Sequence, residues 1–398
     1  MLHRAILIFT LRLFFMANTI DEALVNRIYA MSLIALRKRT SIVRAITVMS
    51  EDMSVASQKF GKVIVPIPFA YPDATDVTAA ATPPAGNDST PEFATVTLDT
   101  WKESSFHLTD SEIGRISANV MGMQMEEAID ALSRTIVKSI LANYTGVYNA
   151  VGTAGTTPFA STATLASTAR KLLNKAGVPK TGRSLLLNDD AEANAINLAI
   201  FQKANESGST MTLTEGEIGR RIGFDWSLES YLPSFTRGTL TGSPLINNAA
   251  VAVGDTTVPM DAGSLTGTVV VGDIFTVAGD TQQYVVTANA TASANAIASV
   301  AFDPPAKVAW ANNAAVTFLA SHDVAGLALQ KQAFAFCSRP LGDAVFEGGS
   351  IIRSIPDSHS GLVLTMEVSR QHKRTAVNYS CLWGSTLVRP ESAVRILG

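Results

Sequence analysis

The sequence predicts an α+β protein made of several units, one of which is an all-β insertion. At 398 residues the chain is longer than one hydrophobic core usually organises. Stretches with helical periodicity and stretches with strict strand alternation both occur, in separate parts of the chain. The composition also changes abruptly at Gly238 and changes back near His322. These observations divide the chain into successive parts of different secondary structure.

The bulk composition favours a protein whose surface is largely covered in its working state. Hydrophobic residues make up 47% of the chain and charged residues only 16%, whereas about 25% is usual in soluble proteins. No apolar run reaches the roughly 18 residues that a bilayer span requires, so no membrane partner is expected. The net charge of −3 argues against a dedicated nucleic-acid binder, which would be basic overall.

The first fifteen residues are interpreted as an upstream extension. Residues 3–15 resemble a short signal peptide, but Arg12 interrupts the apolar run and no small-residue cleavage site follows. Met16 begins a segment typical of a natural start. We therefore expect the structured chain to begin near residue 16.

Residues 16–61 are predicted to form an N-terminal arm. The pattern from Ile20 to Met49 is helical, and its middle is basic. The basic residues are Arg37, Lys38, Arg39 and Arg44. Clustered cations are attracted to phosphate without reading base sequence, so this arm is predicted to lie against a neighbour or to face nucleic acid. A solvated helix face explains the same charges equally well.

Residues 62–108 are predicted to form a long β-hairpin. The first strand has an apolar face made by alternate residues: Val63, Val65, Ile67 and Phe69. Pro66 and Pro68 point to the other face, and because proline cannot donate to a ladder they confine the strand to a sheet edge. A polar loop, 71–91, leads to a second extended stretch, 93–108.

Such a hairpin is too long to fold back onto its own core and needs a surface to lie on, because isolated hairpins are only marginally stable. We therefore expect its large apolar residues, Phe69, Trp101 and Phe106, to contact another subunit. The arm residues Arg37, Lys38 and Arg39 are candidates for the same role.

Residues 109–155 are predicted to contain the longest helix. Thr109 to Glu112 has the form of a capping box. Apolar residues then recur mostly at three- or four-residue steps until the helix stops near Asn143. A length of about thirty residues is well above the usual three or four turns, so the helix should span a whole unit. Its methionines, Met121, Met123 and Met125, are interpreted as core gap-fillers rather than a cofactor box.

The remaining chain shows two different patterns of predicted secondary structure. Residues 156–237 show helices and strands in turn, and 323–347 resume that pattern. Between them, 238–322 contain five aspartates, one lysine and no glutamate or arginine, with Gly-Asp turns between short extended runs. This stretch predicts a small inserted barrel or sandwich. Residues 348–398 show two alternating half-buried strands.

A basic turn joins these last two strands. It carries Arg370, His372, Lys373 and Arg374. The simplest interpretation is a solvated turn, but Arg370, Lys373 and Arg374, together with Arg44, are candidates for facing DNA or a neighbouring subunit.

No motif for common catalysis, phosphate binding or metal binding occurs in the chain. The five histidines, at positions 3, 107, 322, 359 and 372, lack metal-ligand spacing, and so do Cys337 and Cys381. Asp189 and Asp190 are explained by capping and the helix dipole. We therefore expect no metal, no cofactor and no enzymatic activity.

The order of these parts resembles that of tailed-phage major capsid (coat) proteins with the HK97-type fold. The closing segments Leu382–Gly384 and Arg389–Ala393 are similar to the C-terminal end of P22-type coat proteins. The β insertion is similar to the insertion domain of that subgroup in position and character. As architecture the resemblance covers residues 16–398; as literal motif it covers only the last twenty.

The resemblance implies a name for each part. The ranges are 1–15 (upstream extension), 16–61 (N-arm), 62–108 (E-loop hairpin), 109–155 (spine helix and P-domain), 156–237 and 323–347 (A-domain), 238–322 (inserted β domain) and 348–398 (P-domain strands). Some members of this fold cross-link hairpin lysines to asparagines of a neighbour. Nothing in the sequence marks a partner for Lys102, so cross-linking is not carried over to this chain.

The function implied by the resemblance is that of a self-assembling coat subunit. Such subunits form pentamers and hexamers of an icosahedral phage head around double-stranded DNA. A scaffolding protein and a portal are the further implied partners. The implied location is the virion capsid, assembled in the bacterial cytoplasm.

Two other functions compete with this one. The acidic β insertion also suits a secreted or surface β-rich adhesin, which would have a mature N-terminus within residues 1–30. A hydrolase without a recognisable motif is the second alternative, and it would need a pocket with convergent titratable groups.

Overall fold

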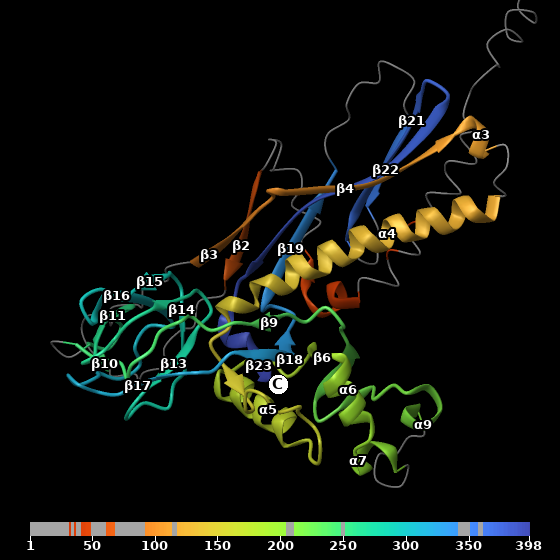
Figure 1. Cartoon of the computed structure of the whole chain (residues 1–398). Helices are drawn as coiled ribbons and strands as arrows, with labels where there is room; N and C mark the ends of the chain where they lie inside the picture. The colour runs from red at the N-terminus through yellow and green to blue at the C-terminus, as the bar shows by residue number, and fades with distance from the viewer. Residues whose placement is uncertain are drawn as a thin grey trace, which may run out of the picture. The chain divides into compact units, whose positions relative to one another are not determined.

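Two units share the chain, and each is drawn from separate stretches of sequence (Figure 1). In the computed structural model the described residues are 32, 36, 41–48, 61–67, 92–113, 118–203, 211–247, 251–340, 351–356 and 361–398. The first unit comprises 1–39, 101–133 and 340–381, and the second 40–100, 134–339 and 382–398. The long helix α4 (Ala118–Leu141) and the strand β22 (Arg374–Leu387) contribute residues to both.

The first unit contains an antiparallel ladder of three strands. Strand β21 (Val363–Gln371) pairs with β20 (Ile351–Pro356) on one side and with β22 on the other. β4 (Thr100–Thr109) also pairs with β22. The alternation predicted from the sequence is confirmed, because Leu364, Met366 and Tyr379 are at most 1% exposed.

The capping box predicted at Thr109 is present. The backbone N–H of Thr109 donates to Glu112 Oε2 at 2.8 Å, and the N–H of Glu112 donates back to Thr109 Oγ1 at 3.3 Å. The helix that it starts, α3 (Asp110–Ile113), is short. Residues 114–117 lie outside the described residues, and α4 begins at Ala118 and continues for 24 residues. The predicted long helix is therefore confirmed over α4.

The buried face of α4 follows the predicted helical spacing, with one correction. Met125, Ile129, Leu132 and Ile136 are buried, but Met123 is 66% exposed. Two residues correspond to about 200° around a helix, so Met123 and Met125 cannot share a face. The side chain of Met121 lies outside the described residues. Met123 is thus a surface residue rather than a core gap-filler.

The hairpin is shorter than predicted. Strand β2 (Lys62–Ile67) pairs with β3 (Glu92–Thr97), placing Val63 opposite Val96. The second extended stretch is interrupted after β3, at residues 98 and 99. The chain then continues as β4, whose backbone pairs with β22 and not with β2.

The base of the hairpin packs on its own unit, contrary to expectation. The inner side chains Val63, Val65, Val96 and Leu98 form one apolar cluster with Ala335 and Cys337 of β19 (Phe334–Arg339). β19 also pairs with the end of β22 and, in parallel, with β1 (Thr47–Val48), which follows the 3-10 helix η1 (Ser41–Ala45). The hairpin therefore has one face in its own core.

The central sheet of the second unit is built around β18 (His322–Gln330). β18 lies between β23 (Ala393–Leu397) and β6 (Arg183–Leu187) and is antiparallel to both. The remaining strands are β5 (Ala150–Val151), β8 (Phe224–Leu228), β7 (Arg220–Arg221) and β9 (Ser234–Phe235). Residues 323–347 were predicted to resume a helix–strand pattern, but their described part forms the strands β18 and β19.

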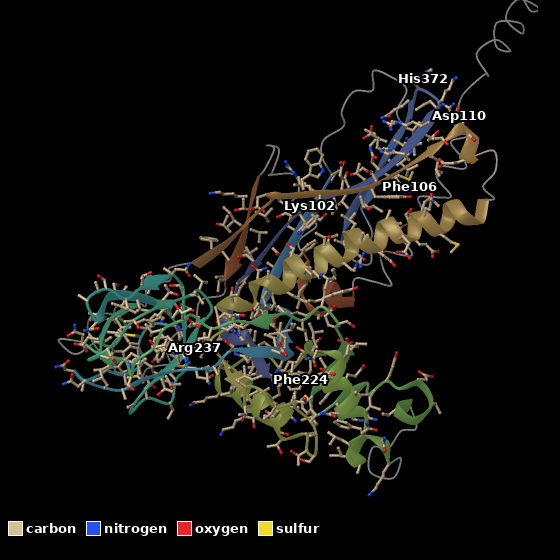
Figure 2. All side chains as sticks on the ribbon, viewed as in Figure 1. Lys102, Phe106, Asp110, Phe224, Arg237 and His372 are labelled. Carbon is tan, nitrogen blue, oxygen red and sulfur yellow. The ribbon has the colours of Figure 1, made fainter. Side chains whose placement is uncertain are left out.

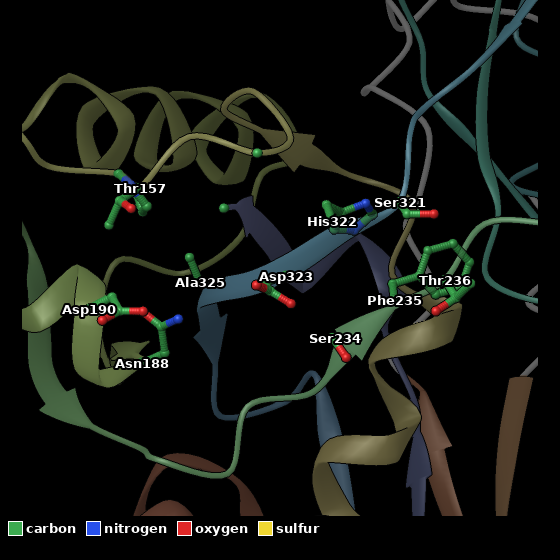
Figure 3. A pocket seen from close by; sticks show the side chains of 13 residues that line it. Thr157, Asn188, Asp190, Ser234, Phe235, Thr236, Ser321, His322, Asp323 and Ala325 are labelled. Carbon is green, nitrogen blue, oxygen red and sulfur yellow. The ribbon is translucent and has the colours of Figure 1, made fainter.

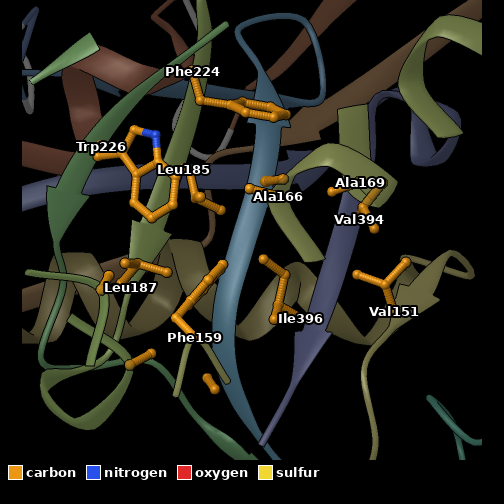
Figure 4. Close-up of a cluster of buried hydrophobic side chains, with 14 of the residues drawn as sticks. Val151, Phe159, Ala166, Ala169, Leu185, Leu187, Phe224, Trp226, Val394 and Ile396 are labelled. Atoms are coloured by element: carbon orange, nitrogen blue, oxygen red, sulfur yellow. The ribbon is translucent and has the colours of Figure 1, made fainter. Parts of the chain in front are cut away.

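Short helices cover this sheet. They are α5 (Thr164–Lys175), α6 (Asp189–Ile196), α7 (Ala199–Gln202) and α9 (Met211–Glu215), with the 3-10 helices η3 (Ala142–Gly146) and η4 (Pro390–Ser392). The helix predicted from Asp189 to Lys203 is broken between α6 and α7. Leu185, Phe224 and Trp226 line the core in Figure 4, and the Trp226 ring lies 5.4 Å from that of Phe159.

Residues 238–322 form a β unit with a hydrophobic cluster of its own (Figure 1). Its antiparallel sheet has the order β10 (Leu245–Ile246), β11 (Thr257–Asp261), β16 (Ala296–Asp303), β14 (Tyr284–Val286), β13 (Ile274–Val277) and β17 (Val316–Phe318). β12 (Thr268–Val269) pairs separately with β15 (Ala290–Thr291). The Phe275 ring lies at the centre, within 6.4 Å of four other aromatic rings: Tyr284, Phe302, Trp310 and Phe318.

The close approach of β3 to β22 yields a stability prediction. A Cβ at Gly384 would overlap the backbone carbonyl of Thr97, so Gly384→Ala should lower the free energy of unfolding by about 1–3 kcal/mol. Denaturant titration measures the change. Gly263→Ala is the matched control, because a Cβ there would meet no atom within 4 Å. Equal stabilities of the two variants would contradict the packing of the hairpin base.

Candidate functional site

The outer face of the hairpin is apolar and exposed. Ile64 is 57% exposed and Phe93 is 58% exposed. Pro66 is also exposed and lies directly opposite Phe93 in the β2–β3 pairing. Side chains on a strand alternate between faces, so these three residues share the face opposite to buried Val63 and Val65. The ribbon therefore carries apolar side chains on both faces, and only one of them is covered. We call Ile64, Pro66 and Phe93 the outer hairpin face.

Trp101 and Phe106 do not share a surface. They are five residues apart on β4, so their side chains point to opposite faces of the strand. Trp101 is 54% exposed. Phe106 is partly buried and lines a groove of about 590 Å³ within the first unit (Figure 2). Exposed Met123 of α4 lines the same groove, whose other lining residues include Glu126 and Glu127.

Several candidate residues lie outside the described part of the chain. These are Phe69, Arg37, Lys38 and Arg39. Arg44 belongs to η1, but its side chain also lies outside what the structure describes. The arm contacts predicted from these residues stay predictions.

The basic turn between β21 and β22 is fastened to the start of α3. Arg370 Nη2 lies 2.7 Å from Asp110 Oδ2, and the Asp110 N–H donates to the carbonyl oxygen of Lys373 at 3.1 Å. Arg374 Nε donates to Gln371 Oε1. An exposed ion pair of this kind contributes at most about 1 kcal/mol. Arg370 and Arg374 are thus engaged within the chain, while Lys373 is exposed at the tip of the turn with a φ of 53°.

A polar pocket of about 410 Å³ lies in the second unit (Figure 3). Asn188 and Asp190 line one side, and Ser321 and His322 the other. His322 Nδ1 lies 2.9 Å from Ala320 O, and Ser321 Oγ accepts from the N–H of Arg237 at 3.0 Å. His322 is therefore oriented by a backbone carbonyl and not by a carboxylate, so the pocket does not present a serine–histidine–carboxylate relay.

The acidic pair Asp189 and Asp190 lies in the first turn of α6. The N-cap itself is Asn188, whose side chain accepts from the Ala191 N–H at 2.9 Å, and Asp189 accepts from Ser230 Oγ at 2.8 Å. Their placement near the positive end of the helix dipole is confirmed. Across the described ranges, no three His, Cys, Asp or Glu side chains gather closely enough to hold a metal ion. No helix within those ranges is long and apolar enough to cross a bilayer.

The sequence reasoning missed the outer hairpin face and two buried arginines. The outer face could have been predicted from the sequence, because Ile64 and Pro66 occupy the alternate positions of the same apolar strand. Arg183 and Arg395 are at most 1% exposed, which a strand pattern does not predict for arginine. Arg183 is satisfied by Pro179 O, Val178 O and Asn174 Oδ1, at 2.6–2.9 Å.

Substitution of the outer hairpin face should reduce self-association without unfolding the subunit. In the double variant Ile64→Ser/Phe93→Ser, both side chains are already more than half exposed, so we expect stability to change by no more than about 0.5 kcal/mol per site. Light scattering across a concentration series measures the association.

Val96→Ala is the matched control on the covered face of the same strand. Val96 is fully buried, and its truncation should destabilise the subunit by about 1–3 kcal/mol. An outer-face variant that unfolds as readily as Val96→Ala would show that Ile64 and Phe93 belong to the core.

No protein-family model matches the sequence, and no curated protein matches it. Solved chains to which this one is similar include one from Mycobacterium phage Che8, at 15% identity over 90% of each chain with a TM-score of 0.48. Another, from the capsid structure of the cyanophage P-SCSP1u, shares 15% identity over 89% of this chain and 86% of that one, with a TM-score of 0.48. A third, from the crystal structure of a virus-like particle from Pyrococcus furiosus, shares 7% identity over 93% and 98% of the chains, with a TM-score of 0.39. The chain is similar to these proteins, but likenesses at this level do not assign it to a family.

Proposed function

We propose that this chain is a major capsid protein that self-assembles into the icosahedral head of a tailed phage. The observation that carries the proposal is the outer hairpin face. A two-stranded ribbon that keeps Ile64 and Phe93 more than half exposed, beside a covered inner face, is built to be covered by another molecule. A second copy of the chain is the simplest such molecule, because a closed shell presents the same surfaces repeatedly.

A closed shell also fits the low charge of the chain. Only 16% of residues are charged, and charged residues are depleted in the cores of protein interfaces. In a shell each contact can be weak, because every subunit is held by several neighbours at once. Pentamers and hexamers arise when one type of subunit contact closes into rings.

The order of the elements supports the capsid reading in particular. A two-stranded ribbon (β2–β3), a long helix (α4), a sheet with covering helices around β18, a β unit and closing strands (β21–β22) follow one another, as in the HK97-type fold that the sequence resembles. In this proposal the ribbon is the E-loop, α4 the spine helix, and the sheet around β18 the A-domain. The β unit at 238–322 is the inserted domain, as in the P22-like subgroup.

The proposal names partners by the same resemblance. Double-stranded DNA is enclosed without sequence recognition, and the basic arm at residues 37–44 supplies cations for phosphate. The β unit, with five aspartates and one lysine, faces solvent, because packed phosphate would repel it. A scaffolding protein directs assembly in the bacterial cytoplasm, and a portal occupies one vertex. The role is structural, with no enzymatic step.

Electron microscopy of the purified protein tests the proposal. The chain, expressed with its scaffold or concentrated alone, should form closed shells or ring-shaped capsomers visible by negative stain. Multi-angle light scattering after size-exclusion chromatography gives the mass of the same particles. A stable monomer at all concentrations, with and without scaffold, would overturn the proposal.

A further inference from the structure

The β unit is joined to the central sheet through two chain crossings that lie side by side. β9 runs into the β unit and pairs with the first residues of β18, which return from it: Phe235 lies opposite His322, and Ser234 opposite Asp323. The N–H of Arg237 also donates to Ser321 Oγ at 3.0 Å. We call residues 234–238 and 320–323 the neck. The neck is one attachment of the β unit, beside the apolar contact that its strands β13 and β14 make with Leu397 of β23.

A buried arginine from β23 clamps the neck. Arg395 is fully buried, and its guanidinium carbon lies 5.0 Å from the ring centroid of Tyr144 and 5.8 Å from that of Phe235. It donates to Thr145 O at 2.8 Å and to Gly272 O, in the β unit, at 3.2 Å. Burial lowers the pKa of Arg395 to about 10, so it stays charged at neutral pH.

A buried carboxylate fastens the neck from the side of the β unit. Asp273 is 2% exposed and accepts from the N–H groups of Gly238, at 3.2 Å, and Val270, at 2.9 Å. Burial raises the pKa of Asp273, while those two N–H groups and the charges of Arg237 and Arg395 oppose the rise. Asp273 and Arg395 therefore form the charged centre around which the two crossings are packed.

His322 completes the neck in its neutral form. It is 5% exposed, and its ring lies 5.4 Å from that of Phe235. Because Nδ1 faces the Ala320 carbonyl oxygen at 2.9 Å, Nδ1 carries the proton and Nε2 is left bare. Nε2 is buried and makes no hydrogen bond within the described part of the chain. A second proton would therefore place a cation at an atom with no acceptor.

The charges around His322 come from every element packed against it. Arg395 on β23 opposes protonation, whereas Asp323 on β18 and Asp273 favour it. Tyr144 of η3, whose ring meets that of Phe235 edge-on at 6.4 Å, has its own pKa raised by burial and stays neutral. Burial is the largest influence and lowers the pKa of His322.

We propose that His322 is a protonation switch that opens the neck. When the imidazole takes a second proton, Nε2–H must reach an acceptor, and water in the pocket beside it, which Ser321 and Thr236 also line (Figure 3), is the nearest source. Rotation of the His322 ring toward that pocket breaks its contact with Ala320 O and removes its packing against the Phe235 ring. The two crossings then separate, while the β unit keeps its apolar contact with Leu397 and the hydrogen bond from the Ala150 N–H to Gln283 Oε1 at 2.6 Å. This inference does not depend on the function proposed above.

The direction of the pH dependence follows from proton linkage. Because the closed neck lowers the pKa of His322, the open neck binds the proton more tightly. The closed state is fully favoured above about pH 6.5, the ordinary histidine value, and loses stability as the pH falls below it. Asp273 has a raised pKa and therefore acts in the opposite direction. Its contribution to the closed state decreases as the pH rises above about 4, the ordinary aspartate value.

Hydrogen–deuterium exchange of the full chain tests the switch. Exchange is followed at pH 7.5, 6.5 and 5.5 and corrected for the intrinsic rate at each pH. Peptides covering 233–240 and 319–326 should lose up to about tenfold in protection between pH 7.5 and 5.5, because pH 5.5 lies about one unit below the ordinary histidine pKa. Peptides from α5 and β6 should keep theirs.

His322→Gln is the decisive variant, because its amide can still donate to Ala320 O and cannot titrate. Its neck peptides should show the same protection at all three pH values. His107→Gln and His372→Gln, both at exposed positions, are the controls and should behave as the wild type. Wild-type protection that persists at pH 5.5, or an equal loss in His322→Gln, would overturn the switch.

A second measurement covers the case in which His322→Gln does not fold. NMR of the wild-type chain with labelled histidine, assigned by comparison with glutamine variants of the other four histidines (3, 107, 359 and 372), gives the titration of His322 directly. The proposal requires the pKa of His322 to lie below the ordinary histidine value of about 6.5. A value equal to the ordinary one or higher would overturn it.

Discussion

The architecture depends on one constraint: a two-stranded ribbon can place only one of its faces on its own core. Alternation along β2 and β3 directs Val63 and Val96 inward, where the absence of a side chain at Gly384 lets the ribbon backbone approach β22. The same alternation directs Ile64 and Phe93 outward. Fully burying one such side chain contributes about 1.5–3 kcal/mol. The uncovered face is therefore a modest adhesive surface, and its repetition in the proposed shell would multiply its effect.

The second unit carries the β unit at 238–322 without a disturbance of its own core. β18 is continuous from the neck into the centre of the sheet, where Leu327 and Leu329 are fully buried between β23 and β6. The neck uses only the first two residues of this strand. Opening the neck at His322 would thus leave the deeper pairing of β18 in place.

Local patterns predicted much of this fold. The start of α3 followed from the capping box at Thr109. The strand faces around Met366 and Tyr379 followed from strict alternation. These features depend on neighbours within a few residues, so the sequence carries their full signal.

The remaining features depend on partners far along the chain. The sequence remains strand-like across Leu98. Only the pairing of β4 with β22 shows that a second strand begins after this residue. In the sequence, Arg395 is expected to point outward from its strand because it is charged. Its burial becomes evident only from its contacts with Tyr144 and Gly272, which are distant in the chain. The opposite orientation of Trp101 and Phe106, in contrast, could have been predicted from the sequence, because two residues at odd spacing on one strand point to opposite faces.

The most direct test of the central claim is hydroxyl-radical footprinting of the outer hairpin face before and after assembly. Ile64 and Phe93 should be oxidised in the free subunit and protected several-fold in assembled particles. Trp226, buried in the core at 8% exposure, is the internal reference and should react equally in both states. Ile64 and Phe93 that remain as reactive in particles as in free subunits would contradict the claim that this face is covered by a neighbour.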